Sequence, residues 1–191
     1  TMNILAFESS CDETAAAVVK DGRTVLSSVI ASSADMHATY GGVVPEIASR
    51  QHVEAIVGLA DEALRQAGLA KGEIDAVAVT YAPGLIGALL VGVSFAKSVA
   101  YGLGVPLIPV HHVRGHIAAN YIAHPDLEPP FLCLCVSGGT TALVDVHAST
   151  RFQVMGGPRD AAAADGLQQP RRVRGLGHPG GGPRATLATA G

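Results

Sequence analysis

The chain begins the same construction twice, and this duplication constrains its fold more than any other feature of the sequence. An apolar strand, a loop of small residues and a second apolar strand are expected over Asn3–Val19, and the same succession returns over Phe131–Val146. The two copies share the order of residue types rather than the residues themselves. Two related lobes, each opening with a β-hairpin, are therefore expected.

Six segments between the two copies show the apolar spacing of a strand or a helix. Strands are expected over Thr24–Ala31, Ile74–Thr80 and Pro106–Val110, and helices over Pro45–Ala67, Leu85–Leu103 and His111–Ala123. The predicted order of the first lobe is then βββαβαβα. This order is typical of the two-lobed α/β proteins of the actin-like, sugar-kinase and Hsp70 (ASKHA) class; a doubly wound sheet of the Rossmann type is the alternative.

Composition separates the end of the chain from the rest. Residues 1–150 carry 7 Lys and Arg against 14 Asp and Glu, whereas residues 151–191 carry 6 Arg against 2 Asp and are rich in Gly, Ala and Pro. The second composition is typical of weakly ordered chain. We therefore predict a first lobe over 1–125, the start of a second lobe over 126–157 and a degenerate tail over 158–191.

Cysteine content and hydropathy favour an intracellular, soluble protein. Cys11, Cys133 and Cys135 form no disulfide or metal-binding pattern, and no signal-peptide pattern precedes the first strand. Ala76–Ala96 lacks charged residues, but its proline, its glycines and its initial strand pattern are atypical of a membrane helix. We expect a cytoplasmic protein with no membrane partner.

His112 and His116 form the sharpest local feature of the sequence. They lie four positions apart in a predicted helix, so both imidazoles project from one face about one turn apart. This spacing suits two ligands of one metal ion, although such histidines can also be ordinary core or surface residues. A further ligand must come from elsewhere, and imidazole pairs do not distinguish iron, zinc and nickel.

The two hairpin loops are candidates for binding an anion. In the first, Ser9–Thr14, small hydroxyl residues can expose backbone N–H groups, and Asp12 and Glu13 can orient a substrate amine. In the second, Gly138 and Gly139 permit close approach of the backbone to a phosphate. A polar turn and a tight hairpin are the simpler interpretations of these loops.

Five motifs occur in the order and spacing of one known family. They are ESSCDET (Glu8–Thr14), GGVVPEIASRQH (Gly41–His52), APGLIGALLVGVSFAKS (Ala82–Ser98), PVHHVRGH (Pro109–His116) and VSGGTTALV (Val136–Val144). Over about residues 1–157 the chain resembles the TsaD family, also called Gcp or YgjD and formerly described as O-sialoglycoprotein endopeptidase. The resemblance implies the two-lobed ASKHA fold. It also implies transfer of threonylcarbamoyl from threonylcarbamoyl-AMP to N6 of adenosine 37 in tRNAs that read ANN codons.

The same resemblance implies roles for individual residues and partners. His112 and His116 match ligands of one divalent ion per subunit, Fe²⁺ or else Zn²⁺, and Asp12 and Glu13 match acidic residues near the reacting groups. The donor carries an AMP-type nucleotide derived from ATP. Residues that match its contacts are Cys135, Val136, Ser137, Gly138, Gly139 and Gly181. The implied partners are tRNA, threonylcarbamoyl-AMP, and proteins of the TsaB and TsaE type.

The chain departs from the family pattern in three places. Arg114 stands where the family usually has Glu, Thr140 stands where it has His, and the sequence beyond Gly157 matches only in part. A substrate-contacting aspartate of the family aligns with Gln168. We expect a pair of compensating frameshifts to explain the altered segment.

The third metal ligand of the family, an aspartate, and a donor-contacting asparagine would lie beyond residue 191. We therefore expect a chain truncated in its second lobe, with weak or no transferase activity. Two other functions are weighed: a non-catalytic, paralogue-like partner protein of the same complex, and a metalloendopeptidase. The histidine pair argues against the first, and the absence of an HExxH motif argues against the second.

Overall fold

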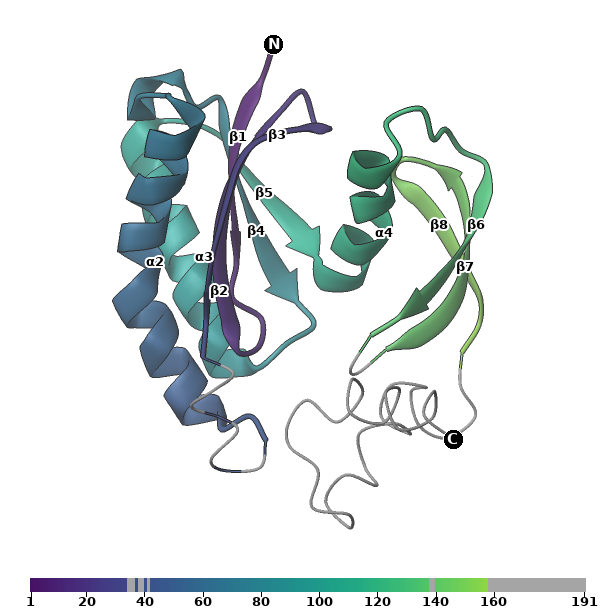
Figure 1. Cartoon of the computed structure of the whole chain (residues 1–191), viewed down its shortest axis with the longest axis horizontal. Coiled ribbons are helices and arrows are strands. Elements are labelled where there is room, and N and C mark those ends of the chain that lie inside the picture. Colours follow the sequence, from purple (N-terminus) through teal and green to yellow (C-terminus); the bar gives the residue numbers. More distant parts are fainter. Residues whose placement is uncertain (34–36, 38–39, 41, 138–139, 158–191) are drawn as a thin grey trace, which may run out of the picture.

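The first sheet has five strands in the order β3-β2-β1-β4-β5 (Figure 1). The computed structural model describes residues 1–33, 37, 40, 42–137 and 140–157. In it, β1 (Asn3–Glu8), β2 (Glu13–Lys20) and β3 (Thr24–Ser32) form an antiparallel meander. The strands β4 (Ala76–Ala82) and β5 (Leu107–His111) continue the sheet parallel to β1.

Two helices, α2 (Pro45–Ala67) and α3 (Ile86–Leu103), cover one face of this sheet (Figure 1). The alternation of β1 directs Leu5 and Phe7 to that face, where they pack with aliphatic residues of β4 and both helices. By length and composition α3 is apolar enough to cross a membrane. In this structure it packs against β4 and α2 as part of the core of the first lobe.

The predicted order βββαβαβα is confirmed, and the antiparallel meander excludes a doubly wound sheet of the Rossmann type. This is the first-lobe topology of the ASKHA class. Most predicted boundaries lie within one residue of the observed ones, and β4 differs most: a short 3₁₀ helix (Lys71–Glu73) delays its start from Ile74 to Ala76, and it extends to Ala82.

The second sheet is smaller and antiparallel, in the order β6-β7-β8. It consists of β6 (Phe131–Val136), β7 (Thr141–Ala148) and β8 (Arg151–Gly156). Of these strands, β8 was not predicted from sequence; it lies where the composition changes. The helix α4 (His112–Ala123) lies between the two sheets (Figure 1). Its Ile117 is buried against Val144 and Val146 of β7, so α4 links the first sheet to the second.

Candidate active site

The first hairpin loop lies between β1 and β2 and is fixed to the start of α3. Ser9 Oγ donates a hydrogen bond to the Ala88 carbonyl at 2.9 Å, and the Leu85 amide donates to the Ser10 carbonyl at 2.8 Å. Both serines are buried. The loop therefore has a defined position relative to the neighbouring strand β4 and its helix.

Two glycines allow the loop to pack closely against α3: Gly84, which precedes the helix, and Gly92, which lies within it. A Cβ atom at Gly84 would lie 2.6 Å from the Ser10 carbonyl oxygen, and one at Gly92 would lie 2.2 Å from Ser9 Oγ. Real Cβ atoms do not approach other atoms so closely. These positions of the motif over Ala82–Ser98 therefore require glycine for the loop to sit where it does.

His52 of α2 fixes the same loop from the other side. Its Nδ1 lies 2.7 Å from Thr14 Oγ1, and its Nε2 lies 2.9 Å from the Cys11 carbonyl oxygen. Because a carbonyl can only accept, Nε2 donates to it, and in the neutral ring Nδ1 then accepts from the threonine hydroxyl. No role was predicted for His52 from sequence. The sequence signal that could have indicated a role is that His52 is the last residue of the motif over Gly41–His52.

Glu8, the last residue of β1, joins the loop to α4. Its carboxylate accepts a hydrogen bond from the Ser10 amide at 2.5 Å and lies 3.1 Å from His112 Nδ1. Burial alone would raise the pKa of this carboxyl, but hydrogen bonds from Ser10, Thr80 and His112 outweigh burial and hold the pKa below its usual value. Glu8 is therefore an anion under neutral conditions.

His112 and His116 face one another, as their spacing predicted. The two Nε2 atoms lie 3.0 Å apart, and the ring planes are inclined by 79°. Desolvation, followed by the charge of His112, lowers the pKa of His116, and Glu8 opposes this only in part. A low pKa keeps the ring in its neutral form, which is the form that binds metal ions.

This pair fits two neighbouring positions around one divalent ion. Metal–imidazole bonds are about 2.1 Å long, so nitrogens 3.0 Å apart would subtend an angle of about 90° at the ion. The opposite nitrogen of His112 contacts a carboxylate, as is usual for metal-binding histidines. Within the described residues, no group of three or more His, Cys, Asp or Glu is arranged to hold a metal, so His112 and His116 would supply only part of the coordination sphere.

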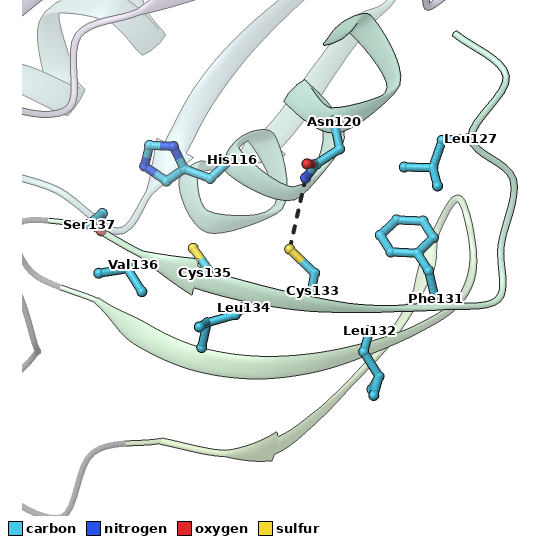
Figure 2. Close-up of a pocket in the computed structure, with 10 residues that line it drawn as sticks. All are labelled: His116, Asn120, Leu127, Phe131, Leu132, Cys133, Leu134, Cys135, Val136 and Ser137. Carbon is cyan, nitrogen blue, oxygen red and sulfur yellow. Dashed lines mark hydrogen bonds between the residues drawn. The ribbon is translucent and has the colours of Figure 1, made fainter. Parts of the chain in front are cut away.

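A pocket of 520 Å³ opens beside this pair, between α4 and β6 (Figure 2). His116 lies at one end of it near Val136 and Ser137, and Cys135 also lines it. On its wall, Asn120 Nδ2 donates a hydrogen bond to Cys133 Sγ at 3.9 Å. The structure thus brings one predicted metal ligand, His116, and three predicted donor contacts, Cys135, Val136 and Ser137, to one cavity.

The remaining predicted site residues that the structure describes are not among those that line this pocket. Asp12 is the last residue of the loop and Glu13 is the first residue of β2. The Asp12 carbonyl accepts hydrogen bonds from the amide and hydroxyl of Ser33. Desolvation and the adjacent Asp12 charge raise the pKa of the Cys11 thiol to about 11, so this residue stays protonated. The predicted donor contacts Gly138, Gly139 and Gly181 lie outside the described residues.

Comparison with known proteins gives consistent matches. Residues 24–191 match the TsaD family, described as tRNA N6-adenosine threonylcarbamoyltransferase. A protein of that name from Clostridium perfringens is 58% identical over 178 residues, which cover 93% of this chain and 52% of the relative. One from Clostridium novyi is 57% identical over 180 residues, covering 94% and 53%. The chain spans about half the length of the curated relatives that it matches.

Solved structures support the fold. A structure of YeaZ from Pseudomonas aeruginosa superimposes with a TM-score of 0.55 at 18% identity, covering 85% of this chain and 71% of that chain. A second structure, described as an uncharacterized protein with similarity to peptidase YEAZ from the same organism, gives 0.54 at 17% identity, covering 85% and 70%. At these identities the likeness concerns the fold alone.

Proposed function

The chain belongs to the TsaD family of tRNA N6-adenosine threonylcarbamoyltransferases, and from this premise we propose that it takes part in transferring threonylcarbamoyl from threonylcarbamoyl-AMP to N6 of adenosine 37 in tRNAs that read ANN codons. The observation that carries the proposal is that His116, which faces His112, lines the same pocket as Cys135 and Ser137. Metal ligation and donor binding would then occur at one place, as the reaction requires.

Catalysis of this reaction depends mainly on positioning the donor and the attacking amine. The donor is a mixed anhydride, so its carbonyl carbon is activated and AMP is a good leaving group. The adenine N6 amine attacks that carbon, the new C–N bond forms, the C–O bond to AMP breaks with its electron pair, and the amine loses a proton. Because this amine is a weak nucleophile, orientation and electrostatic stabilisation have to supply most of the acceleration.

His112 and His116 would hold the divalent ion, Fe²⁺ or Zn²⁺, which when bound acts as a Lewis acid toward the donor. The pocket between α4 and β6 would receive the donor, with Cys135, Val136 and Ser137 along its wall. Asp12 and Glu13, at the end of the fixed first loop, would orient the attacking amine. The loop suits such a role because its hydrogen bonds to α3 and α2 hold it in place, and displacements of about 1 Å are costly in catalysis.

tRNA and partner proteins of the TsaB and TsaE type complete the proposal. Residues 1–150 contain 14 Asp and Glu against 7 Lys and Arg. An acidic surface repels phosphate backbones, and most protein–nucleic acid affinity comes from Lys and Arg contacts to phosphate. We therefore propose that partner proteins contribute basic surface to tRNA binding.

The proposal is tested with the purified 191-residue chain and a non-hydrolysable analogue of threonylcarbamoyl-AMP. Analogue affinity is measured by calorimetry with Zn²⁺ present, for the wild type, for His112→Ala, and for Glu54→Gln as a control at an exposed position of α2. We expect binding by the wild type and the control and a loss of about tenfold or more in His112→Ala. Absence of binding, or equal binding by all three proteins, would contradict the proposal.

The reaction is followed separately in a bacterial strain that lacks the modification. The chain is expressed there, and threonylcarbamoyladenosine in hydrolysed tRNA is measured by mass spectrometry. Because the chain spans about half the length of its curated relatives, we expect a signal below that of a full-length relative. A signal that survives His112→Ala would exclude the metal-dependent reaction.

A further inference from the structure

A carboxylate and two imidazoles form a continuous series across the first sheet and α4. Glu8 Oε2 lies 3.1 Å from His112 Nδ1, and His112 Nε2 lies 3.0 Å from His116 Nε2. We propose that Glu8 is a positioning residue that fixes the tautomer and ring orientation of His112, so that the Nε2 lone pair faces His116 before any ion arrives. This inference rests on the proposed metal site.

The surroundings of His112 Nδ1 decide which ring nitrogen carries the proton. Two oxygens face this nitrogen, Glu8 Oε2 at 3.1 Å and Ser10 Oγ at 3.2 Å. An ionised carboxylate can only accept a hydrogen bond, so Nδ1 is the nitrogen that donates. In the neutral ring, Nε2 then carries the lone pair.

Glu8 can impose this orientation because it is itself held in place. The Ser10 amide donates to its other carboxylate oxygen at 2.5 Å, and the Thr80 side chain also hydrogen-bonds to it. Ser10 and Thr80 are both buried. The anchor is therefore built from β1, the first loop and β4, all of which belong to the packed first lobe.

The consequence concerns His116 and the ion. With Nε2 of His112 as the acceptor, His116 Nε2–H is the donor across the 3.0 Å contact. To bind a divalent ion between these two nitrogens, His116 would have to move its proton from Nε2 to Nδ1 by exchange with solvent, whereas His112 would need neither a new tautomer nor a rotation of its ring. Carboxylates in this position typically account for 10–100-fold in metal affinity, because they fix the ring and make it more basic.

The experiment measures Zn²⁺ affinity of the 191-residue chain by calorimetry and the His112 tautomer by ¹⁵N NMR. Glu8→Ala removes the acceptor, and Glu8→Gln removes the charge but keeps an amide oxygen that can accept from Nδ1–H. We expect Zn²⁺ affinity to fall about 10–100-fold in Glu8→Ala and less in Glu8→Gln. We also expect the Nδ1–H tautomer in the wild type, its retention in Glu8→Gln, and a mixture of tautomers in Glu8→Ala.

Glu54→Gln, an exposed change of the same chemical type, should match the wild type in both measurements. Wild-type Zn²⁺ affinity and tautomer in Glu8→Ala, together with lost affinity in His112→Ala, would overturn the role of Glu8 and leave the metal site standing. Unchanged affinity in His112→Ala and His116→Ala would overturn the proposed site itself. If Glu8→Ala does not fold, Glu8→Gln decides: wild-type affinity there would count against the proposal.

Discussion

The two sheets of this chain start with the same strand–loop–strand unit but are covered very differently. In the first sheet, Leu5 and Phe7 of β1 are buried beneath α2 and α3. In the second, Cys135 of β6 is buried on the α4 side, whereas Leu132 and Leu134 are 63% and 68% exposed on the other side and point away from α4 (Figure 2). The helices of the first lobe thus bury one face of its sheet. The second sheet exposes an apolar face, and faces of this kind usually pack against another part of the protein or a partner protein.

This difference explains how the candidate site is held. The fixed components, Glu8 and Ser10, come from the covered first lobe. The pocket wall that includes Ser137 comes from the less covered second sheet, and α4 with His112 and His116 bridges the two. The position of His112 therefore depends on its contacts with the first lobe, whereas the shape of the pocket depends on α4 and on the second sheet.

The largest expected effect comes from comparing one buried and one exposed apolar residue. Phe7→Ala removes a ring that is 3% exposed and packs edge-on against Phe95 with centroids 5.2 Å apart. We expect a loss of about 3–5 kcal/mol in the free energy of unfolding. Leu134→Ala, on the exposed face of β6, should change it by less than about 0.5 kcal/mol. Urea denaturation measures both, and equal losses would show that the two sheets are covered alike.

A smaller effect is expected where the first loop meets α3. Gly92→Ala would place a Cβ atom 2.2 Å from Ser9 Oγ, so the buried serine has to move and its hydrogen bond to Ala88 is strained. We expect a destabilisation of about 1–3 kcal/mol. Gly58→Ala in α2 is the control: its Cβ meets nothing within 4 Å, and it should stabilise the helix by up to about 1 kcal/mol.

The explanation for Gly92 is checked by a second change. Removing the obstructing hydroxyl with Ser9→Ala in the Gly92→Ala background should recover part of the lost stability, because the two sites share one contact. Strict additivity of the two single changes, measured by the same urea titrations, would show that the contact with Ser9 is not the cause.

Local parts of this arrangement could be predicted from sequence, and distant ones could not. The facing of His112 and His116 follows from helical spacing alone. The contact of Glu8 with His112 joins residues 104 positions apart, and it depends on β4 lying between β1 and β5, which no local pattern states. His52 and Thr14 likewise meet only because α2 packs on β2.

The second sheet shows a different limit. The strand β8 (Arg151–Gly156) is as long as β1 and β6, but it was missed because it begins with a charged residue and, among the described strands, pairs only with β7. Its burial pattern is mostly exposed, so the alternation that marks a half-buried strand is weak there. In the first sheet, β1 and β2 do show this alternation, because one of their faces is buried.

A pH-dependent effect of moderate size is expected at α4. Desolvation and the charge of His112 lower the pKa of His116 below the ordinary 6.5. As the pH falls, His116 therefore takes up a proton in the unfolded chain before it does so in the folded one. Protonation then favours the unfolded chain, so the free energy of unfolding is unaffected by the titration of His116 above pH 6.5 and decreases as the pH falls below it. His116→Gln removes the titrating ring, so we expect a smaller drop in the urea midpoint between about pH 7.5 and about pH 5.5 than in the wild type. An equal drop would show that other groups account for the dependence.

The smallest effect is expected at the exposed edge of the first lobe. Hydrogen bonds from Arg65, then from Gln66, lower the pKa of Glu62 to about 2, and the guanidinium contacts the carboxylate at 2.6 Å. Because the pKa of Glu62 is lower in the folded chain, the ion pair can stabilise the fold above the ordinary pKa of 4.5, and this stabilisation is lost as the pH falls toward 2. Because Arg65 is exposed and Glu62 is partly exposed, solvent screening and the ordering of both side chains offset most of the attraction. Glu62→Gln should therefore leave the urea midpoint at neutral pH unchanged within error. A measurable loss there would mean that the surface of the first lobe, and not only its covered core, contributes to the contrast with the second sheet.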